Sequence, residues 1–243
     1  MSFWKSATKQ VLLDRKMRDQ FFEMFIEEMG EATSTQAVSQ DVIDAWRGHL
    51  PNQLLDYWQQ EGWGTYQHGL FRLVNPDEYE GIAREWLAGT PLAELDRFHV
   101  FACSAFGDLF FCGEKSGPQL RLMSSLAAFV AVPEELRHKP ESECDLEMQL
   151  FFSNMDLRSP DLEDESGKQL FNRARKKLGD LANNEIYGFE PMLPAGGEML
   201  LENLRKVDAQ IHLSILRQIQ EPSMPVDTSV LDLLDERDNE DDD

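Results

Sequence analysis

The side chains with the broadest chemical repertoire in this chain are five histidines, and they are scattered without the spacing of metal-ligand motifs. They are His49, His68, His99, His138 and His212. His99 falls in a predicted strand and His212 in the final predicted helix. This placement favours structural histidines with hydrogen-bonded partners over metal ligands or catalytic bases.

Two glycine-containing motifs resemble parts of reactive sites but lack the rest. Gly196-Gly197 is not preceded by a predicted strand and lacks the Lys-Ser/Thr ending of a phosphate-binding loop. Gly107-Asp108 is typical of hairpin turn chemistry rather than of an acid–base residue. The chain also contains no Gly-x-Ser-x-Gly nucleophile elbow. The motifs therefore predict no catalytic residue and no bound cofactor.

A short acidic run has the chemistry to chelate a hard cation. It consists of Asp161, Glu163, Asp164 and Glu165. The run lacks the glycine and the ligand spacing of an EF-hand loop, so we interpret it as a solvated acidic loop. A hydrolase with an acidic, metal-dependent site is the third hypothesis for the function of the chain, behind the two binding functions described below.

Between Gly62 and Phe111 the sequence combines β-like runs with one amphipathic segment. Three runs rich in aromatic and branched residues are separated by glycines, by Asn75-Pro76 and by Asp108. Pro76 follows a candidate helix cap, and an apolar stripe then recurs at helical spacing: Tyr79, Ile82, Ala83, Trp86 and Leu87. These patterns predict a small antiparallel sheet with a helix across one face.

Helical patterns lie on both sides of this stretch. On its N-terminal side, apolar spacing predicts helices over residues 8–29, 41–48 and 51–61. On its C-terminal side, one stripe runs from Leu170 to Leu181, and a last helix is predicted over 198–220. Residues 186–194 are too rich in proline for a central strand. The predicted fold class is α+β: a small, mostly antiparallel sheet with helices packed on it, followed by a helix-rich C-terminal lobe.

Composition divides the chain into four segments. A charged stretch that contains Pro140 separates the sheet-forming region from the C-terminal helices and is predicted to be a surface connection. Just before it, residues 124–132 fit either a strand or a short helix. The segments are 1–132, 133–160, 161–220 and 221–243. The last one is acidic, and its composition predicts disorder apart from a weak helical turn through Val230, Leu231 and Leu234.

The 243-residue chain carries a formal net charge of −22, and its body is acidic even without the tail. Such a charge repels nucleic-acid phosphates and anionic lipid surfaces, so neither direct nucleic-acid binding nor membrane binding is expected. It favours a basic protein as partner through long-range attraction. An acidic surface that only aids solubility is the alternative, and it stays open at this point.

The three cysteines, Cys103, Cys112 and Cys144, form an odd and sparse set that suits a reducing compartment and gives no disulfide framework. The first two fall in apolar strand patterns, so we interpret them as small core residues. The N-terminus has no apolar signal core, and no window approaches about eighteen apolar residues. We expect a cytoplasmic protein.

Several short motifs resemble a known pair of domains. Those of the first half resemble the GAD-like domain: Leu-Leu-x-Tyr-Trp at 54–58, Gly-Leu-Phe-x-Leu-Val-Asn-Pro at 69–76 and Ala-Phe-Gly-Asp-Leu at 105–109. Those of the second half resemble the domain that usually follows it: Asp-Glu-Ser-Gly-Lys-x-Leu-Phe at 164–171, Tyr-Gly-Phe-x-Pro at 187–191, Gly-Gly at 196–197, Asn-Leu-x-Lys-Val at 203–207 and His-Leu at 212–213. Their order and spacing carry the resemblance, which assigns 1–132 to the GAD-like domain and 161–220 to a helical immunity domain.

Proteins with this pair of domains are immunity proteins of bacterial type VI secretion systems that neutralise a cognate DNase effector. The resemblance implies a cytoplasmic bacterial protein that binds a basic toxin as a monomer, in a one-to-one complex, and blocks its active site or its DNA-binding face. It supplies no catalytic residues and no cofactor. The alternative is an intracellular regulatory or scaffold module that binds another basic protein.

The candidate toxin-binding residues are acids in loops, with aromatic anchors beside them, because buried anchors carry most interface energy while charges set rate and register. The acids are Glu141, Glu143, Asp145, Asp161, Glu163, Asp164 and Glu165, and the anchors are Trp63 and Tyr66. For each acid a solvated surface charge is the alternative interpretation. For Trp63 the alternative is a place in the core.

Overall fold

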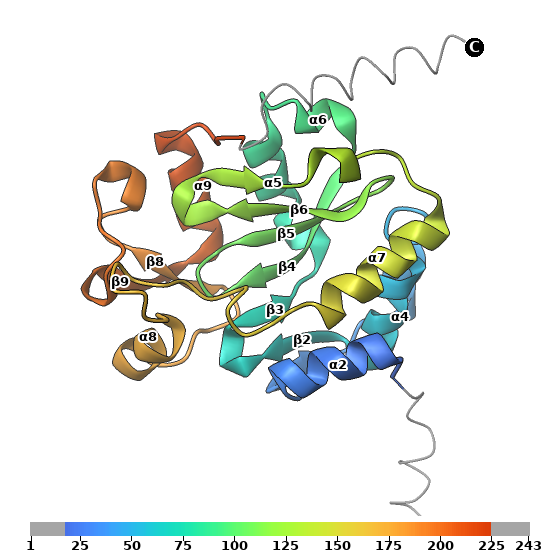
Figure 1. The fold of residues 1–243 in the computed structure, drawn as a ribbon, viewed down its shortest axis with the longest axis horizontal. Helices are drawn as coiled ribbons and strands as arrows, with labels where there is room; N and C mark the ends of the chain where they lie inside the picture. Colours follow the sequence, from blue (N-terminus) through green and yellow to red (C-terminus); the bar gives the residue numbers. More distant parts are fainter. Residues whose placement is uncertain (1–17, 225–243) are drawn as a thin grey trace, which may run out of the picture.

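A seven-stranded antiparallel sheet runs through the middle of the protein (Figure 1). The computed structural model describes residues 18–224. Within them the spatial order of the strands follows the order of the chain. The strands are β1 (Ser34–Gln36), β2 (Trp63–Tyr66), β3 (Phe71–Leu73), β4 (Phe98–Ser104), β5 (Leu109–Gly113), β6 (Gly117–Met123) and β7 (Ala128–Val130). The predicted antiparallel sheet is confirmed.

Both faces of the central strands are buried. Every residue of β4 and β5 is buried, and along β5 the side chains alternate between two apolar clusters, as the two-residue period of a strand requires. Phe110 and Cys112 of β5 belong to the first cluster, and Leu109 and Phe111 belong to the second. Strands without a polar face need a covering layer on each side, and helices supply both layers.

The helices divide between the two faces of the sheet. Three cover the first face: α2 (Gln20–Met29), α4 (Asn52–Glu61) and α7 (Glu141–Ser153). Three cover the second face: α5 (Pro76–Leu87), α6 (Leu92–Leu95) and α9 (Ala209–Ile219). Among the other helices of residues 18–224, α3 (Gln40–Ala45) adds Ile43 to the first cluster, and α8 (Phe171–Leu178) lies in the C-terminal region. The helices predicted near residues 41, 51 and 76 are confirmed, and so is the described part of the one predicted over 8–29.

Asp19 joins the three helices of the first face. Its Oδ1 accepts a hydrogen bond from the backbone N–H of Phe22 at 2.8 Å, which caps α2. Its Oδ2 accepts from Gln53 Nε2 at 2.9 Å and from the Tyr57 hydroxyl at 2.8 Å, both on α4. Gln149 of α7 donates in turn to Gln53 Oε1 at 2.9 Å. Beneath this polar link, aromatic rings of the three helices pack with centroids 4.6 to 5.2 Å apart.

The C-terminal region contains a two-stranded sheet as well as helices. β8 (Glu185–Phe189) pairs antiparallel with β9 (Leu204–Asp208). The helix predicted over 198–220 is therefore wrong in its first part, because α9 begins only at Ala209. Asp208 marks this start by accepting a hydrogen bond from the N–H of Ile211 at 3.1 Å. The apolar residues continue without a break from β9 into α9, so their spacing does not reveal the boundary between the two elements. The capping aspartate marks the boundary instead.

Much of the segment 133–160, predicted to be a surface connection, is the helix α7. The buried side of this helix repeats every four residues through Cys144, Met148 and Phe152. Acids occupy many of its other positions, so the short apolar stripe is hard to recognise in the sequence. Residues 124–132, for which a strand and a short helix were both open, form a 3-10 turn (Ser124–Leu126) followed by β7.

Arg72 of β3 fastens the C-terminal region to the large sheet. Its side chain is buried, and its guanidinium donates to the backbone oxygens of Asn183 at 2.8 Å, Glu185 at 3.0 Å and Ala182 at 3.3 Å. Nearby, the N–H of Tyr187 donates to the oxygen of Ala105 at 2.8 Å. A third apolar cluster combines residues of both regions. The two regions therefore share a core.

The three cysteines are all buried free thiols, which confirms the core interpretation of Cys103 and Cys112. Beyond α9, the chain returns to the edge of the large sheet. The N–H of Phe129 donates to the oxygen of Ser223 at 3.0 Å, and the N–H of Ser223 donates to the oxygen of Ala127 at 2.7 Å. The disorder predicted for the start of the tail, from residue 221, is therefore wrong at Ser223, and the predictions for residues 8–17 and 225–243 lie outside the described residues.

Replacing Arg72 with methionine, which keeps most of the side-chain volume, removes three hydrogen bonds from a buried charged donor to partly buried backbone oxygens. We expect Arg72→Met to lower the free energy of unfolding by about 2–4 kcal/mol in urea denaturation followed by circular dichroism. Amide exchange at Glu185 and Tyr187 should accelerate more than exchange in α4. Arg84→Met, at an exposed position, should change stability by less than about 0.5 kcal/mol. Equal effects of the two substitutions would contradict the fastening role.

Candidate functional site

Three of the seven acids predicted to bind a partner lie at the start of α7, beside the start of α4. Asp145 Oδ1 accepts a hydrogen bond from the N–H of Gln53 at 2.9 Å, and burial raises the pKa of this carboxyl group. Glu141 accepts from the side chain of Asn52, and Glu143 forms an ion pair with Arg137. Because Pro51 gives α4 no side-chain cap, Asp145 of α7 satisfies a backbone N–H group of its first turn.

The other four acids shape the loop before α8. Asp161 Oδ1 accepts from the N–H groups of Leu162 at 2.7 Å and Phe171 at 2.9 Å, and burial raises the pKa of Asp161 to about 6.

Asp164 closes the turn that follows. It accepts from the side chain and N–H of Ser166 and from Arg173, and these bonds hold its pKa far below the ordinary value. Glu163 accepts from Gln169 Nε2 at 2.8 Å while staying exposed, and Glu165 is exposed as well. The structure thus separates two acids that organise the loop, Asp161 and Asp164, from two that face solvent.

The two predicted aromatic anchors lie in or against the core. Tyr66 has no exposed surface, and its ring packs edge-on against Phe25 with centroids 4.7 Å apart. Trp63 is partly exposed and packs edge-on against Trp58 at 5.8 Å. Neither residue offers a protruding aromatic side chain, so an apolar anchor for a partner has to be sought elsewhere on the surface.

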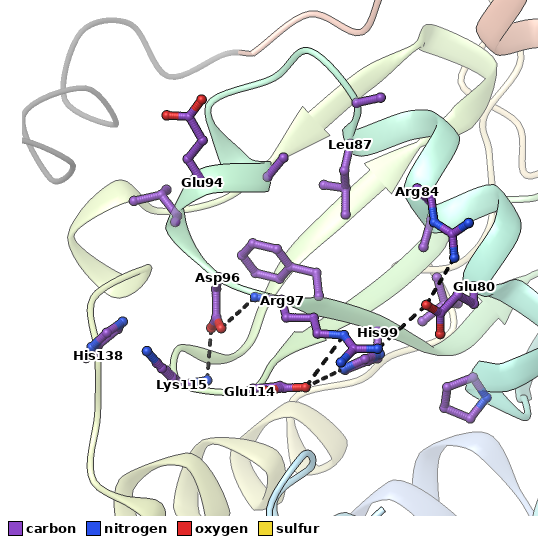
Figure 2. Close-up of a pocket in the computed structure, with 17 residues that line it drawn as sticks. Glu80, Arg84, Leu87, Glu94, Asp96, Arg97, His99, Glu114, Lys115 and His138 are labelled. Atoms are coloured by element: carbon purple, nitrogen blue, oxygen red, sulfur yellow. Dashed lines mark hydrogen bonds and ion pairs between the residues drawn. The ribbon is translucent and has the colours of Figure 1, made fainter.

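A pocket of about 720 Å³ opens between α5, α6 and the end of the β4–β5 hairpin (Figure 2). Its floor is apolar and its rim is charged. The charged and titratable side chains that line it are Glu80, Arg84, Glu94, Asp96, Arg97, His99, Glu114, Lys115 and His138. The sequence analysis missed this site because its residues come from separate segments that only the hairpin register brings together.

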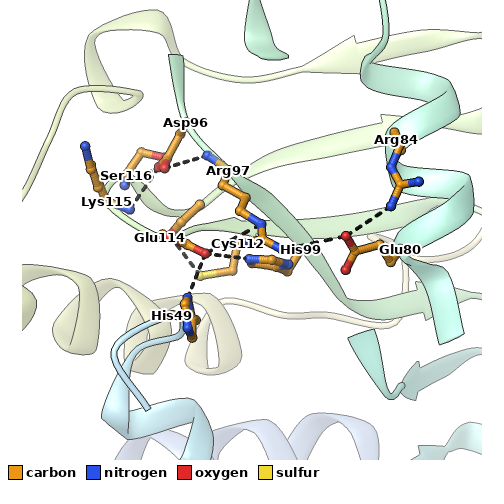
Figure 3. Close-up of polar contacts among 11 residues, drawn as sticks. His49, Glu80, Arg84, Asp96, Arg97, His99, Cys112, Glu114, Lys115 and Ser116 are labelled. Atoms are coloured by element: carbon orange, nitrogen blue, oxygen red, sulfur yellow. Dashed lines mark hydrogen bonds and ion pairs between the residues drawn. The ribbon is translucent and has the colours of Figure 1, made fainter. Parts of the chain in front are cut away.

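Glu114 is the centre of the charged rim (Figure 3). Its Oε1 lies 2.9 Å from His49 Nδ1 and 3.0 Å from His99 Nε2, so each of these ring nitrogens carries a proton. Arg97 Nε lies 3.8 Å from the same oxygen, and the other end of its guanidinium lies 3.6 Å from Glu80 Oε1. A chain of alternating charges therefore crosses the rim, and it ties the loop after α3 to the sheet through His49.

The pKa values of this cluster reflect a balance between burial and hydrogen bonding. Burial of the His99 imidazole lowers its pKa below 6.5, and the nearby Glu114 offsets only part of this effect. Burial raises the pKa of Glu114, but the hydrogen bonds from His99 and His49 together outweigh it and leave the pKa below its ordinary value. At neutral pH the arrangement is a carboxylate that accepts hydrogen bonds from the neutral imidazole of His99 and from His49, with the guanidinium of Arg97 nearby.

Asp96 fixes the turn that carries Glu114. Its Oδ2 accepts from the N–H of Lys115 at 2.9 Å and from the N–H and hydroxyl of Ser116, both at 2.8 Å. The charged groups of the rim are thus bound largely to one another and to backbone. Among residues 18–224, no group of three or more His, Cys, Asp or Glu side chains is arranged to hold a metal ion.

The fold is similar to that of a solved structure. The crystal structure of Atu4351 from Agrobacterium tumefaciens matches with a TM-score of 0.73 and 24% sequence identity, over 86% of this chain and 95% of that chain. At this identity the match shows the fold alone. No curated protein matches the chain.

Two protein families match successive parts of the chain. Residues 20–126 match the GAD-like domain, which here comprises the helices α2 to α6 and the strands β1 to β6. Residues 145–220 match the C-terminal domain of the T6SS immunity protein Tdi1, and this match begins within α7. The chain therefore has the domain architecture of a type VI secretion system immunity protein, a GAD-like domain followed by the Tdi1 C-terminal domain, as the resemblance in sequence implies. In the described part of the chain, no helix combines the length and the apolar character needed to cross a membrane.

The stability of the fold should depend on pH through His99. The unfolded imidazole takes up a proton near pH 6.5, whereas the buried one resists protonation, so the free energy of unfolding should fall as the pH drops below about 6.5. His99→Gln should reduce this dependence, measured by urea denaturation between about pH 7.5 and about pH 5.5. His138→Gln, at an exposed position, is the matched control. An unchanged pH dependence in His99→Gln would show that burial does not govern this histidine.

Proposed function

We propose that the protein is an immunity protein that binds and neutralises a cognate type VI secretion DNase effector by stoichiometric occlusion of its active site or its DNA-binding face. The observation that carries the proposal is the match of residues 145–220 to the C-terminal domain of an immunity protein. The net charge of −22 supports a basic target. A DNase has to present a positive surface to DNA phosphates, and an acidic protein can dock there by charge complementarity.

In this proposal the acids have two different tasks. Glu141, Glu163 and Glu165 are exposed, and Glu143 is partly exposed, so these four can attract a basic partner over a distance. Asp145 accepts a hydrogen bond from the neighbouring helix α4, and Asp161 and Asp164 accept hydrogen bonds in the loop before α8 and from its first residue. Their contribution to binding is to hold the exposed acids in place.

The proposed action needs neither a cofactor nor a covalent step. The inhibitor acts as a monomer, one molecule per toxin, in the cytoplasm where bacterial DNA is exposed to the effector. The charged rim of the pocket is consistent with an action without cofactor or covalent step, since the carboxylates of Glu114 and Asp96 bind neighbouring parts of the same chain. Neutralisation then depends on the affinity and lifetime of the complex.

The direct test is a titration of the effector encoded beside this protein's gene. We expect DNA cleavage to fall linearly with added protein and to stop at one equivalent, with nanomolar affinity by calorimetry. Raising the salt concentration from about 50 mM to about 300 mM should weaken the complex, because exposed charges contribute to its formation. Absence of binding would refute immunity for this pair and favour a scaffold module for another basic protein.

The steering acids can be tested by charge reversal. The double variant Glu163→Lys/Glu165→Lys should lower the association rate constant about threefold to tenfold at low salt and leave the dissociation rate nearly unchanged. The control Glu23→Lys/Glu27→Lys makes the same change in net charge on α2. If both variants associate equally slowly, only the total charge matters, and the loop before α8 has no special role.

A further inference from the structure

The outer face of α9 exposes three isoleucines at four-residue spacing. Ile211, Ile215 and Ile219 are 65%, 41% and 47% exposed. The inner face of the same helix already buries Leu213 and Leu216 in the second apolar cluster. When α9 packs onto the sheet, the isoleucine stripe therefore stays exposed to water. Such an exposed apolar stripe does not stabilise the isolated chain and is typical of an interaction surface.

Beside this stripe lies a groove of about 490 Å³ between α5 and α9, which run next to each other (Figure 1). Gly81 of α5 leaves its middle open, since a side-chain carbon at this position would meet no atom within 4 Å. The lining contains one carboxylate and no lysine or arginine: Gly81, Ile82, Glu85, Gln210, Ile211, Ser214, Ile215 and Gln218.

The polar groups around the groove favour a positive partner. Glu85 lines the groove and is exposed, with one oxygen accepting from the Ser214 hydroxyl at 2.8 Å. Glu78 is exposed one helical turn away from Gly81, and its backbone oxygen accepts from Gln210 at 2.8 Å. The nearby cation, Arg217, is directed away to the backbone oxygens of Glu85 and Ala88, at 3.0 and 3.1 Å. The surface thus combines an apolar stripe with free carboxylate oxygens.

We infer that the α5–α9 groove is a docking site for an apolar segment of the DNase effector that is flanked by lysine or arginine. This inference rests on the proposed function and supplies the apolar anchor that Trp63 and Tyr66 do not provide. The isoleucines would bury against the apolar side chains of the segment, and Glu85 and Glu78 would receive its cations. A surface that binds DNA phosphates provides such cations.

Charge argues against two other occupants of the groove. A second copy of this chain, bound through a two-fold axis, would place Glu78 and Glu85 of one copy near those of the other, where like charges repel. The segment 226–243 is rich in aspartate and glutamate, so it would meet the same repulsion. A basic partner avoids this cost.

Two variants test the docking site against the same effector in binding kinetics and in DNA cleavage. Ile211→Ser/Ile215→Ser removes the apolar stripe without changing charge, and Gly81→Leu fills the groove while improving helix propensity. Each should weaken binding at least about 30-fold, mainly through faster dissociation, and neither should lower the unfolding midpoint. The matched control is Leu146→Ser/Leu150→Ser, which removes two exposed leucines at the same spacing on α7.

The outcomes separate this inference from the function on which it rests. If the wild-type chain binds and inhibits the effector and both groove variants do so equally well, the docking site is wrong and the immunity function stands. Loss of binding in the α7 control alone would move the site to α7. A wild-type dimer, seen by light scattering, that dissociates in Ile211→Ser/Ile215→Ser would assign the groove to a second copy and overturn the inference. No binding by the wild-type chain would overturn both.

Discussion

The burial of β4 and β5 on both faces is the constraint on which the rest of this structure depends. Because both faces of this strand pair are apolar, neither face can be left exposed to solvent, and a layer of helices has to cover each one. The chain builds each helical layer from segments that are far apart in the sequence. The first layer takes α7 from the middle of the chain, and the second takes α9 from its C-terminal part. The region that matches the immunity domain is therefore part of the cover of the GAD-like sheet and not an appended module.

Polar contacts then fix how these layers sit. Asp19 links three helices of one layer, Arg72 holds the backbone of the C-terminal region, and Glu114 draws the loop after α3 to the sheet. In each case one partner is a charged group, which gives strong and directional hydrogen bonds. For the proposed inhibitor function such fixed positions are an advantage, because little conformational freedom is then lost on binding to another protein.

Local signals in the sequence predict much of the fold. The capping residue Asn75, the proline after it and the stripe through Trp86 locate α5, and the alternation of aromatic and branched residues locates the central strands. The boundary between β9 and α9 was missed because one apolar pattern serves both elements and only Asp208 separates them. The helix α7 was missed because its buried residues are few and its remaining positions are rich in acids, as they would be in a loop.

The site was harder to predict than the fold for a related reason. The acids at 161–165 stand out in the sequence, yet the carboxylates of Asp161 and Asp164 accept hydrogen bonds at the loop before α8. The predicted anchor Tyr66 lies inside the core. His49, His99 and Glu114 meet only through the pairing of β4 with β5 and the placement of the loop after α3. The exposed face of α9 cannot be recognised before its buried face is known, since apolar residues occur on both sides of the helix: leucines on the buried side and isoleucines on the exposed side.

The short edges of the sheet have a consequence for the behaviour of the protein at high concentration. Both edge strands, β1 and β7, have only three residues, and Ser223 already uses backbone groups beside β7. The edges therefore offer few unpaired backbone N–H and C=O groups with which a strand of another molecule could pair. Under the proposed immunity function the protein has to be present before the toxin arrives, and it can then accumulate without its sheet becoming a template for aggregation.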